Sequence, residues 1–224
     1  MATAIRLGNS SGSAGVSAYS DLSPGWQAAW TQGWEAYQTG NKAIGAAIIN
    51  SAGEVLAVGR NRTRAARQVN GLISGFDLAH AEVNALLSLP KVSREEGLTL
   101  TLLTTIEPCP QCAGTLVMSQ VRRLSYAAAD PWAGCVSLLS ENTYMASKRV
   151  AVSRGPSDLT RAAQVLNVLE ELAAGTFSGP FRERFELAVP DAVRVAERLH
   201  TAETVSKLWS PETAYLQLLQ GLQP

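Results

Sequence analysis

The sequence predicts an α/β fold: a three-layer α/β/α arrangement around a mixed five-stranded sheet, extended at its C-terminal end by further helices. Apolar runs of strand length alternate with helical segments over the first two thirds of the chain. The last third instead carries apolar residues at helical spacing. With 224 residues, of which 46% are hydrophobic, the chain can build one compact domain with extensions.

The first predicted elements are a helix and a hairpin. Residues 24–38 carry aromatic residues at helical spacing, which is most simply a helix packed on a sheet rather than an aromatic binding surface. Apolar runs over 43–50 and 54–58 are joined through Ser51-Ala52-Gly53, which predicts a hairpin. The stretch 59–78 has no period and is long for a connection, so we expect an active-site loop there.

The remaining core elements follow in alternation. They are a short helix that opens at His80 and ends before Pro90, a strand over 98–105, a helix from Cys109 to about Gln120, and strands over 123–128 and 149–152. Two of these helices begin after the ends of strands, at one edge of the sheet. Clefts form at such an edge in α/β folds, so we expect the functional site there.

The C-terminal third reads as helices. An apolar stripe runs from Leu159 to Leu172 and ends before Gly175; a second helix follows Pro190, and Ser210-Pro211 begins a third. These helices could cover the cleft, thicken a subunit interface or cap the core. His200, alone on the second of them, is expected to be structural or solvated rather than a ligand.

Three residues have the chemistry of a zinc site. A catalytic zinc takes three nitrogen or sulfur ligands and leaves the fourth position to water, and His80, Cys109 and Cys112 supply that set. The cysteines are three residues apart, so both sulfurs fall on one face of a helix start, and Pro108 precedes them. We expect about one Zn²⁺ per chain.

Glu82 lies next to this set without being needed as a ligand. Zinc lowers the pKa of its bound water, and a neighbouring carboxylate can accept that proton and pass it on. A structural zinc clip needs no such acid. The alternatives are a structural site, two buried helix starts that bind nothing, or a zinc- or nucleotide-binding module without turnover; the intact Glu82 argues against the last.

The two motifs resemble a known family. His80-Ala81-Glu82 and Pro108-Cys109-Pro110-Gln111-Cys112 spell H-x-E and P-C-x-x-C, the zinc deaminase signature. Residues 25 to about 156 resemble the cytidine deaminase-like superfamily, within it the bacterial tRNA adenosine deaminase and guanine deaminase branch. The resemblance implies that Glu82 shuttles protons, that Asn61 binds the substrate ring and that the Ala81 N–H holds a ring atom.

Domain boundaries follow from this resemblance and from composition. We expect a mobile segment over 1–22, rich in Ser, Gly and Ala, a zinc deaminase domain over 23–156, and a helical extension over 157–224 packed on the core. The loop between Asn61 and His80 is longer than the resemblance suggests. Whatever contacts the far side of the base, with Phe76 and Asp77 as candidates, is therefore left unassigned.

Charge bears on the partners. The chain has 19 basic and 19 acidic residues, and its last third has more acidic than basic ones. Binding to tRNA usually needs a basic face. The one basic cluster comprises Arg60, Arg62, Arg64 and Arg67, which could meet a phosphate or be solvated.

We therefore predict a zinc-dependent hydrolytic deaminase of an amino-bearing nucleobase or nucleoside, in which water attacks the ring carbon and ammonia leaves. The alternative substrate is adenosine in tRNA. No apolar run reaches transmembrane length, and with two cysteines assigned to metal, unpaired Cys135 indicates a reducing cytoplasm. The resemblance further implies a homodimer, with residues 131–145 near the interface.

Overall fold

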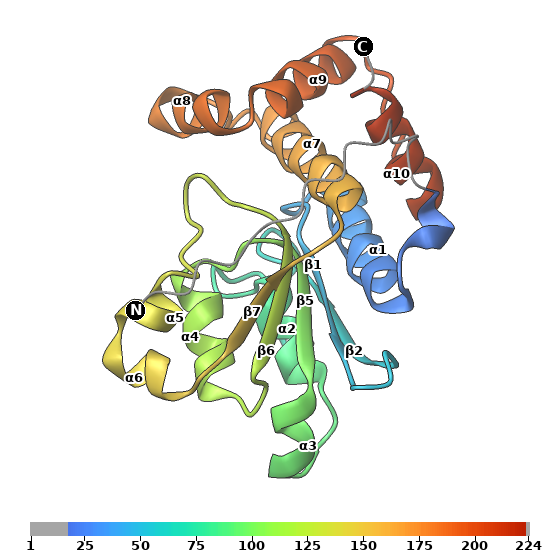
Figure 1. The fold of residues 1–224 in the computed structure, drawn as a ribbon. Helices are drawn as coiled ribbons and strands as arrows, with labels where there is room; N and C mark the ends of the chain where they lie inside the picture. Colours follow the sequence, from blue (N-terminus) through green and yellow to red (C-terminus); the bar gives the residue numbers. More distant parts are fainter. Residues whose placement is uncertain (1–17, 223–224) are drawn as a thin grey trace, which may run out of the picture.

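A mixed five-stranded sheet forms the centre of the protein, whose computed structural model describes residues 18–222 (Figure 1). The strands lie in the order β2-β1-β5-β6-β7. Their bounds are Gly45–Ile49 for β1, Val55–Arg60 for β2, Thr101–Ile106 for β5, Arg123–Ala128 for β6 and Ala151–Arg154 for β7. Strand β1 runs antiparallel to β2 and β5, whereas β5, β6 and β7 are parallel. The predicted fold class is confirmed.

Helices cover both faces of this sheet. On one face lie α2 (Ala81–Ser88) and α4 (Pro110–Met118), and on the other α1 (Pro24–Gln38) and α7 (Ser157–Ala173). Successive side chains of a strand point to opposite faces. Ala46 and Ile48 accordingly belong to the apolar cluster with α2 and α4, while Ala47 belongs to the cluster with α1 and α7.

The tryptophan stripe of α1 lies in the core, as predicted, but it contacts more than the sheet. The indole N–H of Trp30 donates to the carbonyl of Pro211 at 2.7 Å, and that of Trp34 donates to the carbonyl of Trp209 at 2.9 Å. Both side chains are fully buried. Residues nearly two hundred positions apart thus share one core.

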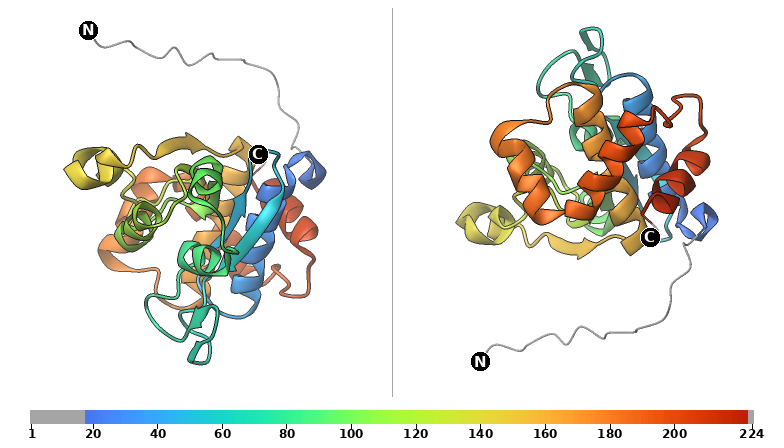
Figure 2. Two further views of the ribbon diagram at one scale, coloured as in Figure 1. Left: turned by 90° about the horizontal axis from the view of Figure 1, so that it is seen from below. Right: turned by 90° about the horizontal axis from the view of Figure 1, so that it is seen from above.

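Four helices make up the C-terminal part: α7, α8 (Gly179–Ala188), α9 (Pro190–Thr201) and α10 (Pro211–Gln220). Helix α7 packs on β5, β6, α9 and α10, and α10 packs on α1. From above, these four helices lie in front of the sheet (Figure 2). The sequence analysis missed α8 because only one of its residues, Phe185, is buried and its apolar period is therefore weak.

Several boundaries differ from the prediction. A helix α3 (Arg94–Thr99) occupies the start of the segment predicted as a strand, and its signal was a capping box between Ser93 and Glu96. Strand β7 begins later than predicted, after Arg149, whose φ is 52°. Short elements within the expected loops are β3 (Gln68–Val69), β4 (Ile73–Ser74), α5 (Leu138–Glu141) and α6 (Thr143–Ser147).

The expected mobile segment lies mostly outside the described residues, which begin at 18. Its last five residues are placed on the domain: Tyr19–Asp21 form a 3-10 turn, and Leu22 is buried in the cluster with α1. Over residues 18–222, no helix has both the length and the apolar character needed to cross a membrane.

Gly59 sets how closely α2 approaches the sheet. A Cβ at this position would lie 2.2 Å from the backbone nitrogen of Ala85 and 2.3 Å from the carbonyl oxygen of Ala81. Only glycine permits this backbone contact. The contact fixes the first turn of α2, which carries the H-x-E motif.

Candidate active site

His80 stands at the start of α2, as its N-cap residue, with an extended backbone. The preceding turn is tied to the other motif, because the Gln111 side-chain amide donates to the carbonyl of Leu78 at 2.8 Å. Ile106 of β5 lies opposite Ala128 of β6, so the segments that follow both strands leave the sheet at the same edge. The predicted position of the site at one sheet edge is thereby observed.

The two cysteines lie at the start of α4. Cys109 is the N-cap residue, Pro110 occupies the first turn, and Cys112 is buried one turn further on. The helix thus begins at Pro110, one residue after the predicted start at Cys109. Pro110 suits this position because its fixed φ is helical and its missing N–H would have had no partner there.

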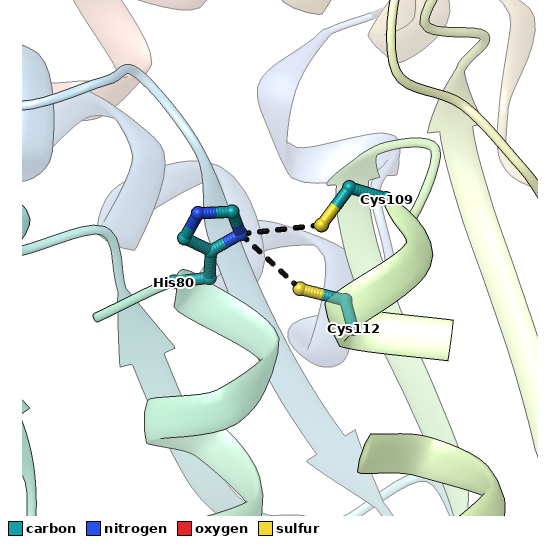
Figure 3. Close-up of side chains that lie close together, drawn as sticks. All are labelled: His80, Cys109 and Cys112. Atoms are coloured by element: carbon teal, nitrogen blue, oxygen red, sulfur yellow. Dashed lines mark hydrogen bonds between the residues drawn. The ribbon is translucent and has the colours of Figure 1, made fainter. Parts of the chain in front are cut away.

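The three side chains converge (Figure 3). His80 Nδ1 lies 3.4 Å from each of the two sulfurs, of Cys109 and Cys112, and all three ligand atoms lie within 4.8 Å of one another. Ligands around a tetrahedral zinc, with bonds of about 2.0–2.3 Å, are separated by roughly 3.5 Å. The spacing and the donor types therefore fit Zn²⁺, with room for one further ligand.

The two cysteines of the cluster differ in their proton equilibria. The hydrogen bond from Cys112, followed by that from His80, lowers the pKa of Cys109 to about 4. The same bond to Cys109, together with burial, raises the pKa of Cys112. One sulfur is thus a ready thiolate, and the other must give up its proton when it binds a metal.

Glu82 is buried beside the cluster, with 3% of its surface exposed. Its Oε1 accepts a hydrogen bond from the Thr104 hydroxyl and its Oε2 accepts one from the Cys112 thiol, both at 3.2 Å. Burial raises the pKa of this carboxyl group. A raised pKa lets this carboxyl group hold a proton more readily than an exposed one, as a group that takes up and passes on protons must.

A cavity of about 380 Å³ opens onto the cluster. His80, Glu82 and Cys109 line it, and Cys112 is buried behind them. The remaining lining residues come from the loops after β5 and β6, from the α1–β1 connection and from the C-terminal helices: Lys42, Ile44, Glu107, Asp130, Trp132, Ala133, Asn167, Glu171, Thr176, Phe181 and Phe185.

The two predicted substrate-binding residues do not line this cavity. Asn61 is fully buried; its Oδ1 accepts from the backbone and hydroxyl groups of Thr63, while its Nδ2 has no partner among the described residues. Ala81, also buried, is the first residue of α2, where backbone N–H groups lack helical partners. Each therefore carries a donor that has no partner among the described residues, although neither lines the cavity.

The loop before His80 is held by a residue that the sequence analysis did not single out. The Asn84 side chain accepts from the backbone of Ile73 at 2.8 Å and donates to the carbonyls of Ile73 and Arg60. It thereby ties the β3–β4 hairpin to α2. The Arg67 guanidinium lies over the ring of Phe76, at 4.0 Å from its centroid, and neither Phe76 nor Asp77 lines the cavity.

The sequence analysis also missed the cavity residues on α7 and α8, namely Asn167, Glu171, Phe181 and Phe185. A signal was present at one of them: Asn167 interrupts an otherwise apolar run between Leu166 and Val168. A buried polar residue in such a run needs a hydrogen-bond partner. The identity of that partner depends on the tertiary fold and cannot be predicted from the local sequence.

Comparisons with known proteins agree with the site. A sequence model described as the cytidine and deoxycytidylate deaminase zinc-binding region matches residues 21–128. The chain is 31% identical over 156 residues to a tRNA-specific adenosine deaminase of Bacillus subtilis, covering 66% of this chain and 81% of that protein. It is 27% identical over 122 residues to a cytosine deaminase of Candida albicans, covering 54% of this chain and 76% of that protein.

Among solved structures, a guanine deaminase from Nitrosomonas europaea superposes with a TM-score of 0.48 and 21% identity, over 66% of this chain and 85% of that chain. The motif residues, their convergence and the sequence matches lead to the same result. The chain belongs to the cytidine and deoxycytidylate deaminase family, carries its zinc-binding region, and is a hydrolytic deaminase.

Proposed function

We propose that the protein deaminates a free nucleobase or nucleoside. The observation that carries this proposal is the cavity beside Glu82, whose volume of about 380 Å³ suits a single small ligand. The helices α7 and α8 border it on the side away from α2 and α4. Similarity to the Candida albicans cytosine deaminase agrees with a free base as substrate.

The charges near the site support a small substrate. Within the basic cluster of the β2–α2 loop, Arg60 pairs with Glu35 and Arg64 pairs with Glu170, and Arg67 stacks on Phe76. Guanidinium groups that are engaged in this way are poorly available to phosphates. The cluster thus favours a structural role over a tRNA-binding role.

We assign the roles of the site residues as follows. His80, Cys109 and Cys112 hold one zinc ion per chain, Glu82 is the catalytic acid and base, and Asn61 and Ala81 bind the substrate through their unpaired donors. Bound zinc polarises a water molecule and lowers its pKa towards about 7. Cys112 loses its thiol proton on binding metal, which frees Glu82 Oε2 from the contact seen here.

Glu82 then moves the protons of the reaction. It accepts one proton from the attacking water at Oε2 and delivers it to a ring nitrogen of the substrate as the new carbon–oxygen bond forms. It next accepts the remaining hydroxyl proton and passes it to the departing amino group. The carbon–nitrogen bond breaks, ammonia leaves, and the carboxylate is restored.

A second candidate function is deamination of adenosine in tRNA, which the 31% identity to the Bacillus subtilis enzyme favours. We further propose that the protein is a cytoplasmic homodimer with the 131–145 region near its interface. Exposed apolar side chains near this region support that assignment: Trp132, Tyr144 and Met118 are all more than half exposed.

Ammonia release by zinc-loaded protein, measured against a panel of bases, nucleosides and an anticodon stem-loop, tests the proposal. We expect the highest kcat/KM for a free base or nucleoside. A stem-loop that is deaminated far faster than every small substrate would establish the second candidate. In parallel, Glu82→Gln should keep zinc and lose about 10²–10⁴-fold or more in kcat, whereas Glu54→Gln, on the exposed β1–β2 turn, should not change it.

A further inference from the structure

The C-terminal helices supply one wall of the cavity that His80 and Glu82 line. Helix α7 contributes Asn167 and Glu171, and α8 contributes Phe181 and Phe185. This wall lies outside the region that matches the deaminase family, which ends at residue 128.

The outer part of the wall is aromatic. Phe181 meets Trp132, from the loop after β6, edge to face with ring centroids 5.7 Å apart, and it packs on Phe185 at 4.7 Å. Such pairs exclude water and favour flat rings. The loop after β6 reaches towards α8 in Figure 1, and the contact of Trp132 with Phe181 joins this loop to the C-terminal extension.

The cavity is also lined by polar side chains, and nearly all of them form ion pairs or hydrogen bonds with other groups of the protein. Lys42 pairs with Glu171, which also accepts from the Thr176 hydroxyl. Glu107 accepts from the backbone of Asp130 and Val136.

Asn167 is the exception in this wall. It lies one helical turn before Glu171 on α7, is only 7% exposed and lines the cavity, and among residues 18–222 its side-chain amide has no hydrogen-bond partner. An amide that faces a cavity without a protein partner is available to pair with a ligand there.

We propose that Asn167 is the specificity-determining residue that recognises the substrate edge facing α7, in the cavity that Phe181 and Trp132 also line. The inference rests on the proposed function. An asparagine amide offers one acceptor and two donors in one plane, and it pairs with a ring edge that presents an adjacent donor and acceptor. The substrate class is thus a flat heterocycle that carries such an edge in addition to the amino group that is removed.

The test compares Asn167→Leu with wild type on the base or nucleoside that gives the highest kcat/KM in the panel. Leucine keeps the size of the side chain and removes both hydrogen-bonding functions. We expect kcat/KM to fall roughly 10- to 100-fold, with unchanged zinc content. Gln164→Leu, also on α7 but lining a separate cavity with Arg161, is the matched control and should lie within about twofold of wild type.

A series of deaza analogues, each with one ring nitrogen replaced by C–H, identifies the contact. If Asn167 reads the ring, the analogue against which wild type discriminates most strongly should lose that disadvantage in Asn167→Leu. Affinities measured by calorimetry in the zinc-loaded Glu82→Gln background should show the same loss without turnover. Equal discrimination by wild type and Asn167→Leu for every analogue would overturn the inference.

Two further outcomes are separable. If Asn167→Leu does not fold, Asn167→Asp replaces it; it keeps the shape and the acceptor but loses the donors, and it should reverse the preference between analogues that need a donor and those that need an acceptor. An unchanged preference in Asn167→Asp would also overturn the inference. A wild-type enzyme that releases no ammonia from any small substrate contradicts the proposed function itself, whereas an active wild type with unaffected Asn167 variants contradicts only the role of Asn167.

Discussion

The helix pair α2 and α4 and the helix pair α7 and α8 border the same cavity with different chemistry. The first pair presents His80, Glu82 and Cys109 from helix starts that follow loops or strand ends. The second pair presents an amide, a paired carboxylate and two phenyl rings from residues within the helices. The reactive groups of the cavity thus come from α2 and α4, whereas α7 and α8 contribute the residues that define its shape.

The two regions also differ in how they are held. The first turn of α2 is fixed by a backbone contact with Gly59, and the turn before it is tied to α4 by Gln111. The position of α7 depends on a core shared with α1, α9 and α10. A change in the distant α10 helix can therefore alter the wall of the cavity without touching the zinc ligands.

The largest expected effect is that of removing the C-terminal helices. A chain truncated after Gly155 would expose Trp30 and Trp34, which are fully buried under them, and would lose two indole hydrogen bonds. We expect no soluble, folded protein, as measured by size-exclusion chromatography and circular dichroism. A soluble truncated chain that binds zinc would show that the two regions are independent.

The next effect is confined to the first region. Cys109→Ala should lose most of the bound zinc and all measurable turnover, because two ligands rarely retain Zn²⁺, while the fold persists. Cys135→Ser is the matched control and should retain zinc, since the Cys135 thiol donates to a carbonyl and is not in the ligand cluster. Elemental analysis measures the zinc content per chain of both variants. Undiminished zinc in Cys109→Ala would contradict the assignment of Cys109 as a zinc ligand.

A smaller effect tests how far α10 supports the fold. Leu218 is fully buried, whereas Leu208 is 94% exposed. Leu218→Ala should lower the free energy of unfolding by about 2–5 kcal/mol, and Leu208→Ala should change it by less than about 0.5 kcal/mol. Urea denaturation measures both. Equal effects would mean that α10 does not pack on the core in solution.

The smallest effect is a pH dependence on α7. Burial raises the pKa of Glu170, although the hydrogen bond from Arg64 acts against this. The folded state therefore holds this proton at pH values where the unfolded chain has lost it, and the stability it contributes declines as the pH rises through the folded pKa. Glu170→Gln cannot ionise, so its stability relative to wild type should increase from pH 4.5 towards pH 7. A constant difference across that range would contradict the shift.

Much of the first region could be predicted from the sequence because its signals are local. The spacing of Cys109 and Cys112, the pairing of His80 with Glu82, and the aromatic period of α1 each need only a few neighbouring residues to be recognised. The zinc cluster and the order of the core elements follow from such patterns. The missed α3 helix had a local signal too, the Ser93–Glu96 capping box.

The second region could not be predicted in the same way. Asn167 and Phe181 are common residue types, and their positions at the cavity follow from the packing of α7 on β5 and β6 and from the contact of α8 with Trp132. That packing joins residues more than thirty positions apart. The spacing of apolar residues along the chain does not indicate this packing. The sequence therefore predicted helices here but left open whether they cover the cleft.

The central claim is that the substrate contacts both regions at once, and hydrogen exchange on ligand binding tests it most directly. Zinc-loaded Glu82→Gln would be compared with and without the preferred base or nucleoside by mass spectrometry. We predict slower exchange both in peptides covering 78–86 and in peptides covering 165–185. Protection confined to the motif peptides, with 165–185 unchanged at saturating ligand, would contradict the account.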